Sequence, residues 1–202
     1  MTRKPTVYVV DDDPAVRRSL EWLVRSQGYD AEVYASAQEF LDLYDPAQPG
    51  CLVLDVRMPG MSGLELQRRL LAQNAPLPVI IISAHGEIPM AVRALKDGAL
   101  DFIPKPLSRQ LLLERIGEAI EKDARARRQR ARRTDVSNRL SLLTPRQRQV
   151  MGLMVRGLPS KVIAADLGIS QKTVAIHRAQ IMARTGVESL AELVQLVIGA
   201  GA

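Results

Sequence analysis

The stretch CLVLDVRMPGMSG, residues 51–63, decides how the rest of the chain is interpreted. Its first four residues are apolar and run directly into Asp55, and the chain then turns through Met-Pro-Gly (residues 58–60) before a helical pattern begins near Gly63. A short apolar run bounded by proline and glycine is typical of a strand that is buried on both faces of a parallel sheet. Open sheets of this kind bind ligands at the carboxyl ends of their strands, which is where Asp55 stands.

Similar apolar runs recur through the first part of the chain and alternate with segments of helical periodicity. Strands are predicted at residues 6–10, 31–34, 51–55, 77–82 and 100–103. Helices are predicted at residues 16–24, 36–43, 64–71, 89–95 and 107–120. This strict alternation predicts a doubly wound α/β domain, a flavodoxin-like (βα)5 sheet with right-handed crossovers and strand order 2-1-3-4-5.

Charge is distributed unevenly along the 202 residues. Residues 1–120 carry 13 Lys and Arg against 16 Asp and Glu, a net charge of −3, whereas residues 121–202 carry 15 against 6, a net charge of +9. The second part therefore favours a polyanionic partner. The run EKDARARRQRARR (121–133) predicts a solvated helical connector that ends within residues 134–138, with a disordered linker as the alternative. We expect three parts: a domain of residues 1–120, a connector of residues 121–139 and a domain of residues 140–202.

Composition restricts the class of protein. With 47% hydrophobic and 25% charged residues, the chain is typical of a soluble globular protein. Cys51 is the only cysteine, so an internal disulfide is impossible, which fits a reducing cytoplasm. The apolar run Val7–Val10 is too short for a signal peptide, and no run approaches the roughly 18 apolar residues of a membrane span. We therefore expect a cytoplasmic protein without a membrane partner.

Acidic residues stand at the predicted carboxyl ends of two neighbouring strands. Asp11 and Asp12 follow the first strand and Asp55 ends the third, and these strands are adjacent in the 2-1-3-4-5 order. Carboxylates in one crevice repel each other unless a cation lies among them, and oxygen ligands with retained waters suit Mg²⁺. A carboxylate beside that ion can attack a phosphoryl group, which is the chemistry of an aspartyl phosphate. The structural alternative is that Asp55 only turns the chain.

Two further strand ends supply groups that suit a phosphate. Ser83 ends the fourth strand and offers a hydroxyl donor beside a small residue, Ala84. Lys105 follows the fifth strand, where its ammonium group can place a positive charge on a phosphate oxygen. Each residue alone is common on protein surfaces. Acidic, hydroxyl and basic residues at successive strand ends in this order favour a phosphoryl-binding site.

Four motifs stand at these strand ends: VVDDD (9–13), LDVRMPGMSG (54–63), IISAHG (81–86) and DFIPKP (101–106). They resemble the motifs of the receiver domain of two-component response regulators. The resemblance implies that a sensor histidine kinase transfers a phosphoryl group to Asp55. We interpret His85 as a loop residue, with a catalytic role as the alternative. The resemblance implies these further roles: Mg²⁺ held by Asp11, Asp12, Asp55 and the backbone carbonyl of Arg57, phosphoryl contacts from Lys105 and Ser83, and a conformational switch at Ser83 and Phe102.

The last third of the chain has helical periodicity throughout. Its helices are predicted at residues 145–156, 160–167, 171–184 and 190–198. The first begins at Thr144-Pro145, a capping residue followed by a proline at the first helical position. The second and third are joined by the tight turn Gly168-Ile169-Ser170, and two short helices joined in this way are the signature of a helix-turn-helix. The sequence therefore predicts a small all-α domain of four helices.

The third of these helices has one side that suits a DNA groove. At 100° per residue, Val174 and Ile181 share one side with Arg178, and the side opposite them carries Lys172, Ile176, Ala179 and Ala183. That opposite side is the one available to a major groove. Lys172 is the main hydrogen-bond donor on it, because small and apolar side chains make no bidentate bonds to bases. Thymine methyl contacts or DNA shape are expected to supply the remainder of the recognition.

The domain resembles the LuxR-type DNA-binding domain. Together with HGEIPMAV (85–92), the motif TVAIHRAQIMA (173–183) makes the whole chain similar to the FixJ and NarL group of response regulators. The resemblance implies double-stranded promoter DNA as a partner. It implies base contacts from Ala175, Ile176 and Ala179 and backbone contacts from Lys161, Thr173 and Arg184.

We therefore expect a phosphorylation-controlled transcription regulator that is not an enzyme beyond assisting its own phosphorylation. On phosphorylation it would form a homodimer that places two helix-turn-helix units on two half-sites. Two alternatives remain open. A Mg²⁺-dependent phosphatase would use Asp11 and Asp13 as haloacid dehalogenases do, although Ala15 stands where that pattern has Thr or Val. A DNA-binding protein that ignores phosphorylation would use the first domain only as a dimerisation scaffold.

Overall fold

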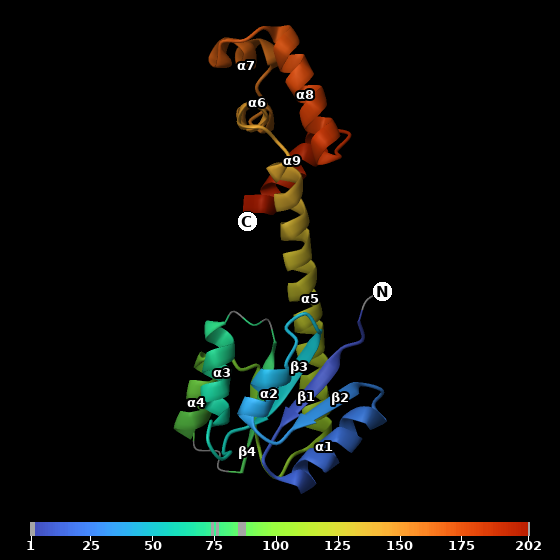
Figure 1. The fold of residues 1–202 in the computed structure, drawn as a ribbon, viewed down its shortest axis with the longest axis vertical. Helices are drawn as coiled ribbons and strands as arrows, with labels where there is room; N and C mark the ends of the chain where they lie inside the picture. Colours follow the sequence, from blue (N-terminus) through green and yellow to red (C-terminus); the bar gives the residue numbers. More distant parts are fainter. Residues whose placement is uncertain (1–2, 74, 76, 85–87, 202) are drawn as a thin grey trace. The chain divides into compact units, whose positions relative to one another are not determined.

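The computed structural model describes residues 3–73, 75, 77–84 and 88–201 (Figure 1). The chain divides into two compact units, Met1–Arg127 and Arg128–Ala202. His85, interpreted above as a loop residue, lies outside the described residues. The first unit contains a parallel sheet of five strands in the order β2-β1-β3-β4-β5, which confirms the predicted doubly wound fold.

Strands and helices of the first unit alternate along the chain. The strands are β1 (Thr6–Val10), β2 (Asp30–Tyr34), β3 (Gly50–Asp55), β4 (Val79–Ser83) and β5 (Asp101–Pro104). The helices are α1 (Pro14–Ser26), α2 (Ala37–Leu43), α3 (Gly63–Ala72), α4 (Ile88–Lys96) and α5 (Arg109–Ser141). The side chains of Asp13, Ser36 and Ser62 accept hydrogen bonds from the first turns of α1, α2 and α3, so each of these helices begins at a capping residue.

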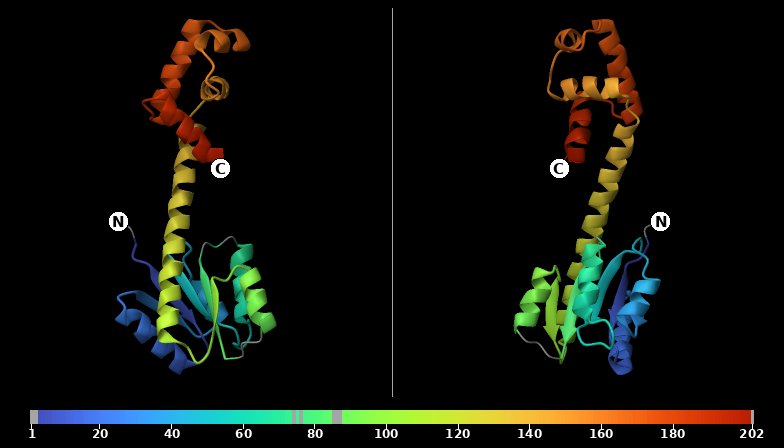
Figure 2. Two further views of the ribbon diagram at one scale, coloured as in Figure 1. Left: turned by 180° about the vertical axis from the view of Figure 1, so that it is seen from behind. Right: turned by 60° about the vertical axis from the view of Figure 1, so that its left-hand side comes forward.

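Helices cover both faces of the sheet (Figure 2). On one face α2, α3 and α4 pack against strand residues such as Tyr8, with Leu66 of α3 in the centre of that core. On the other face α1 and α5 pack against residues such as Val9, with Leu112 of α5 among them. Every residue of β1 and β3 is buried, because these central strands have helices on both sides. Their continuous apolar runs follow from this double burial.

Most element boundaries differ from the predicted ones by one to three residues, and two of the differences have a clear physical reason. β4 begins at Val79 rather than at residue 77, because Pro78 has no N–H to donate to a neighbouring strand. α5 begins at Arg109 rather than at residue 107, because the Ser108 hydroxyl accepts a hydrogen bond from the Leu111 N–H at 3.4 Å and so caps the helix there.

The predicted helical connector is the continuation of α5. The helix is continuous to Ser141, so the predicted end within residues 134–138 is wrong. Asp135 and Arg139 form an ion pair at 3.0 Å across one turn, and Leu140 packs against the core of the second unit. These contacts outweigh the weak helix propensity of the residues around them.

The second unit contains the four predicted helices. They are α6 (Pro145–Val155), α7 (Ser160–Leu167), α8 (Gln171–Thr185) and α9 (Leu190–Gly201). Val150 of α6, Ile163 of α7 and Val174 and Ile181 of α8 are fully buried and form the centre of its core. Among the described residues, no helix is both long and apolar enough to cross a membrane.

Replacement of Gly63 by alanine tests how tightly the turn after β3 is built. A Cβ atom at Gly63 would lie 2.0 Å from the Asp55 carbonyl oxygen, so backbone atoms must shift to accommodate it. We expect Gly63→Ala to lower the free energy of unfolding by about 1–3 kcal/mol, as overpacked substitutions do. Gly117→Ala is the control, because Gly117 lies inside α5 with its nearest atom, the Tyr29 hydroxyl, at 4.0 Å. Urea denaturation that finds both variants as stable as the wild type would contradict this account.

Candidate functional site

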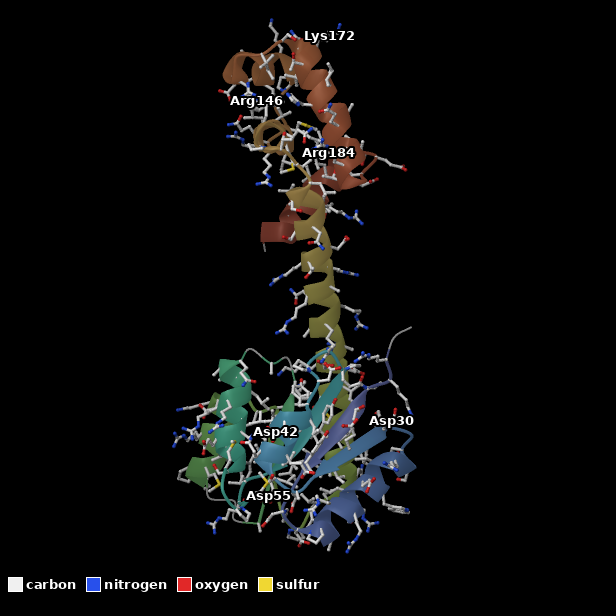
Figure 3. All side chains as sticks on the ribbon, in the orientation of Figure 1. Asp30, Asp42, Asp55, Arg146, Lys172 and Arg184 are labelled. Atoms are coloured by element: carbon white, nitrogen blue, oxygen red, sulfur yellow. The ribbon has the colours of Figure 1, made fainter. Side chains whose placement is uncertain are left out.

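Asp11 and Asp55 lie side by side at the carboxyl edge of the sheet. Figure 3 labels Asp55 there. β1 and β3 pair in parallel with Val10 opposite Leu54, so the next residue of each strand reaches the same level. Asp11 is 1% exposed and Asp55 is 5% exposed. Two carboxylates with so little solvent repel each other strongly unless a positive charge is present.

Lys105 supplies that positive charge. Its Nζ lies 2.7 Å from Asp11 Oδ2 and 2.6 Å from Asp55 Oδ1. The Lys105 backbone N–H donates to the Ser83 carbonyl oxygen at 2.7 Å, which fixes the loop after β5 beside the end of β4. One ammonium group therefore bridges two carboxylates that come from separate strands.

Burial and charge act in opposite directions on these groups. Burial raises the pKa of Asp55 above its usual value; Lys105 offsets part of that rise, and the Asp11 carboxylate adds to it. Burial alone would lower the pKa of Lys105, but hydrogen bonds to the two carboxylates outweigh it and raise that pKa. Lys105 thus stays charged, and its charge is what keeps Asp55 available as a carboxylate.

The loop between β1 and α1 is held by several hydrogen bonds. The Asp13 N–H donates to Asp11 Oδ1 at 2.9 Å, and the Asp13 side chain accepts from the Ala15 N–H at 2.7 Å. Arg17 Nη1 donates to the Asp11 carbonyl oxygen at 2.6 Å, a contact that no sequence pattern indicated. Asp12 is exposed, and within the described part of the chain its carboxylate has no hydrogen-bond or ion-pair partner. Its oxygens are therefore open to solvent and to ligands.

The predicted metal ligands are only partly assembled. Asp11 and Asp55 are joined through Lys105, but no three His, Cys, Asp or Glu side chains in the described ranges are grouped as a ready-made metal site. Arg57 contributes its N–H to Asp55 Oδ2 at 2.6 Å, while its side chain is exposed. The turn after β3 therefore orients the Asp55 carboxylate through backbone atoms.

The two predicted switch residues lie on neighbouring strands, two positions apart in the register. Ser83 ends β4 and is 1% exposed. Phe102 in β5 pairs with Ile81 of β4 and is half-buried against the core under α2, α3 and α4. Any movement of Phe102 would therefore change packing on that face of the sheet.

The second unit presents the predicted helix-turn-helix. Gly168 adopts a left-handed conformation with φ of 63° at the end of α7, and the Ser170 side chain accepts from the Thr173 N–H at 3.0 Å to start α8. Figure 3 labels Lys172 in the first turn of α8. The predicted groove residues of α8 are all exposed: Lys172, Ala175, Ile176 and Ala179. Ile176 is 49% exposed, which is unusual for a large apolar side chain.

The predicted backbone contacts differ in how free their side chains are. Lys161 is exposed, and Thr173 is half-buried with its hydroxyl 2.8 Å from the Ser170 hydroxyl. Arg184 is exposed but donates to the Leu142 carbonyl oxygen at 2.9 Å and to Gln147 Oε1 at 3.2 Å. Arg184 thus links α8 to the start of α6, a role that the sequence did not indicate.

Comparisons with known protein families match both parts of the chain. Residues 7–117 match the model of the response regulator receiver domain, and residues 141–197 match that of bacterial regulatory proteins of the luxR family. The chain belongs to the response regulators. In this response regulator a receiver domain and a LuxR-type DNA-binding domain stand in one chain, and its function is phosphorylation-controlled transcription regulation.

The whole length of the chain is similar to known regulators. It is 42% identical to the transcriptional regulatory protein FixJ of Bradyrhizobium diazoefficiens over 201 residues, which cover 100% of this chain and 98% of that protein. It is 41% identical to the response regulator protein TodT of Pseudomonas putida, over 96% of this chain and 86% of TodT.

Solved structures show the same similarity. The response regulator StyR shares 49% identity and a TM-score of 0.91, over 96% of this chain and 98% of that one. Full-length FixJ from B. japonicum shares 41% identity and a TM-score of 0.59, over 99% and 98% of the two chains.

Removal of the bridging ammonium group should destabilise the receiver in a pH-dependent way. We expect Lys105→Ala to lower the free energy of unfolding by about 3 kcal/mol at pH 8, since it leaves buried carboxylates unpaired. Without Lys105, the already raised pKa of Asp55 rises further, so the folded protein binds a proton more readily than the unfolded chain. The deficit should therefore be smaller at pH 5 than at pH 8, because uptake of that proton favours the folded state as the pH falls. Thermal unfolding at both pH values measures it, with the exposed Lys96→Ala as control.

Proposed function

We propose that Asp55 is the phosphoacceptor of this response regulator and that a sensor histidine kinase supplies the phosphoryl group. The observation that carries the proposal is the bridge from Lys105 to Asp11 and Asp55 at the carboxyl edge of the sheet. It combines a carboxylate nucleophile, a second carboxylate and a fixed positive charge within hydrogen-bond distance. In the transfer, a bond forms between an Asp55 oxygen and phosphorus while the phosphorus–nitrogen bond of phosphohistidine breaks.

The residues around Asp55 have separate tasks in this reaction. Lys105 keeps Asp55 ionised before transfer. After transfer it can pair with a phosphoryl oxygen, because that oxygen is negatively charged and lies close to where the Asp55 carboxylate was. The Arg57 N–H fixes the rotation of the Asp55 carboxylate. Ser83 and Phe102 are the residues that we propose respond to the new phosphoryl group, since they lie on the two strands that end beside it.

The acidic pocket suits Mg²⁺. Its donor atoms are oxygens, and the pocket already holds a cationic group between Asp11 and Asp55. Asp11, Asp12, Asp55 and the Arg57 carbonyl would hold the ion, with Asp12 available because its carboxylate has no other partner among the described residues. Bound Mg²⁺ would neutralise charge on the incoming phosphoryl oxygens.

We propose that residues 140–202 form the DNA-binding domain, that residues 1–120 form the receiver and that residues 121–139 connect them. The exposed Ile176, Ala175 and Ala179 would contact thymine methyl groups, with Lys172 as hydrogen-bond donor to bases. Lys161 and Thr173 would contact the DNA backbone; Arg184 would do so with those of its donors that are not bound to Leu142 and Gln147.

An apolar stripe on α4 supports dimerisation. Ile88 is 80% exposed, and Val92 and Leu95, one and two turns later, are 44% and 46% exposed. Side chains at this spacing share one face of a helix, and an exposed apolar face of this kind favours a protein partner. We propose that phosphorylation brings two copies together through this stripe in the cytoplasm.

The match to the receiver-domain family favours a response regulator over the Mg²⁺-dependent phosphatase that the sequence left open as an alternative.

Substitution of the phosphoacceptor tests the first half of the proposal. Asp55→Asn should abolish acid-labile phosphate incorporation from a radiolabelled phosphodonor with Mg²⁺, because an amide is not a nucleophile towards phosphorus. Asp42→Asn is the matched control, since Asp42 is an exposed carboxylate on α2. Label retained by Asp55→Asn would place the phosphorylation site elsewhere, and turnover of a generic phosphate ester would revive the phosphatase alternative.

Light scattering tests dimerisation. Beryllofluoride with Mg²⁺ should raise the mass of the wild-type protein to about that of two chains, since an isologous pair is the commonest closed assembly. Val92→Glu should remain a monomer, because it places a charge in the apolar stripe. Leu71→Glu, at another exposed apolar position 58% open to solvent, should still dimerise. An unchanged mass for the wild type would rule out phosphorylation-driven assembly.

A further inference from the structure

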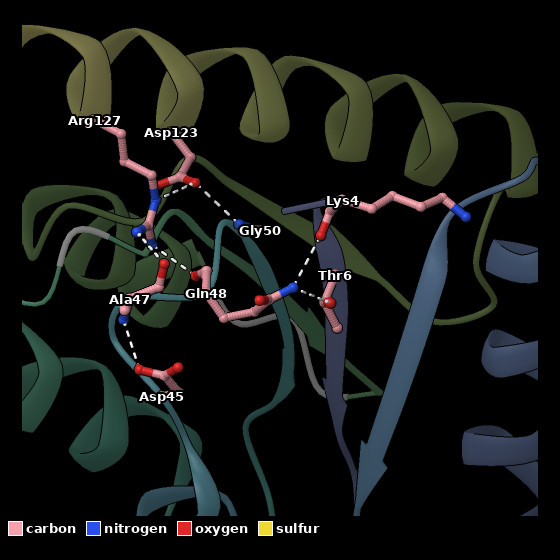
Figure 4. Close-up of polar contacts among 8 residues, drawn as sticks. All are labelled: Lys4, Thr6, Asp45, Ala47, Gln48, Gly50, Asp123 and Arg127. Atoms are coloured by element: carbon pink, nitrogen blue, oxygen red, sulfur yellow. Dashed lines mark hydrogen bonds and ion pairs between the residues drawn. The ribbon is translucent and has the colours of Figure 1, made fainter. Parts of the chain in front are cut away.

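A buried carboxylate lies within the strongly charged part of α5, where the sequence predicts only solvated residues. Asp123 is 1% exposed, in contrast to its neighbours Glu121 and Lys122, which are exposed. Its Oδ2 accepts a hydrogen bond at 2.9 Å from the N–H of Gly50, the first residue of β3 and 73 positions away in the sequence (Figure 4). A charge buried in this way must be paired, or it is expelled to water.

Arg127 pairs with Asp123 and also binds the loop before β3. Its Nε lies 2.9 and 2.8 Å from the two Asp123 oxygens. Its Nη1 donates to the Ala47 carbonyl oxygen at 3.0 Å, and its Nη2 donates to the Gln48 carbonyl oxygen at 2.7 Å (Figure 4). All three nitrogens of the guanidinium group are thus used, which a lysine at this position could not reproduce.

The loop that receives Arg127 is itself firmly held. The Ala47 N–H donates to Asp45 Oδ1 at 2.8 Å, and the Gln48 side chain donates to the Lys4 carbonyl oxygen at 2.9 Å and to the Thr6 hydroxyl at 3.0 Å. The loop that carries the acceptors of Arg127 is therefore held at the start of β1 by contacts that do not involve α5. Removal of the guanidinium group would cost α5 a rigid attachment point.

This contact is placed where a connector would need to be secured. Gly50 begins β3 and Asp55 ends it, so the contact and the phosphoacceptor lie at opposite ends of one strand. Arg127 is also the last residue of the first compact unit, and α5 continues beyond it as an exposed helix as far as residue 135. Within the described part of the chain, Asp123 and Arg127 make the last side-chain hydrogen bonds from α5 to the receiver.

We propose that Asp123 and Arg127 form an anchor that couples phosphorylation to DNA binding. This inference rests on the proposed function, in which a phosphorylated dimer engages two half-sites. The anchor makes the root of the connector a rigid part of the receiver. When two binding modules are linked, the second binds at an effective concentration set by the stiffness and reach of the link. A connector that detaches at its root would lower that concentration and tolerate half-sites at the wrong spacing.

Three variants of the full-length protein test the anchor. Arg127→Ala removes it, Arg127→Lys keeps the charge but not the three-way contact, and Asp123→Asn keeps the shape but not the charge. Arg125→Ala is the matched control, because Arg125 lies on the same helix and, among the residues described, its side chain makes only an exposed ion pair with Glu121. Acid-labile phosphate incorporation and binding to a duplex with one half-site, selected from a random pool with wild-type protein, report whether each domain is intact.

The decisive readout is binding to duplexes with two half-sites. In the wild type and in Arg125→Ala, beryllofluoride with Mg²⁺ should tighten binding, and moving the half-sites apart by about half a helical turn, ~5 base pairs, should abolish that gain. In Arg127→Ala the increase in affinity caused by beryllofluoride should be more than about fivefold smaller and should no longer depend on the spacing of the half-sites. The reason is that the effective concentration of the second DNA-binding domain at its half-site falls. Amide exchange in residues 118–133 should accelerate by more than about tenfold as the helix root opens.

The possible contrary results are distinguishable. A gain in Arg127→Ala that equals the wild type and keeps its spacing dependence would overturn the anchor while leaving the proposed function intact. Loss of phosphate incorporation in all three variants, Arg127→Lys included, would also overturn it, because the pair would then serve folding of the receiver rather than coupling. A wild-type protein that takes up phosphate and shows no gain for two half-sites would refute the proposed function as well.

Discussion

Two nearly solvent-free carboxylates held by a single ammonium group are the constraint on which this structure depends. Asp11 and Asp55 lie together at the edge of the sheet, and the positive charge that offsets their mutual repulsion is that of Lys105, whose Nζ lies within 2.7 Å of each. The strand order makes this possible, because β1 and β3 are neighbours and β5 ends close enough for its following residue to reach them. A site held together by opposite charges is sensitive to any added charge. A phosphoryl group on Asp55 would offer Lys105 new oxygen atoms and so change its ion pairs with Asp11 and Asp55.

Local sequence patterns predicted this part of the molecule well. The strand order, the position of Asp55 and its meeting with Asp11 all follow from apolar runs that end in polar residues, so a pattern of a few residues is enough to locate them. The helices α6, α7 and α8 were equally clear, because a capping residue or a glycine marks at least one end of each.

Contacts between distant residues were not visible in the sequence. The burial of Asp123 depends on Gly50, 73 positions away, and the attachment of Arg184 depends on Leu142, 42 positions away. Within EKDARARRQRARR, Asp123 looks like any other charged residue of a solvated helix. The prediction that α5 ends within residues 134–138 was wrong for the same reason. Leu140 packs against the core of the second unit, and this packing overrides local helix propensity.

Binding of selected DNA by the phosphorylated and unphosphorylated full-length protein tests the central claim most directly. A duplex with two half-sites, selected from a random pool, would be titrated with wild type and with Asp55→Asn, each with and without beryllofluoride and Mg²⁺. Beryllofluoride should tighten binding of the wild type by at least about tenfold, a change of about 1.4 kcal/mol, and should leave the affinity of Asp55→Asn unchanged. Equal affinities for all four states would contradict that claim and would make the receiver a scaffold that phosphorylation does not control.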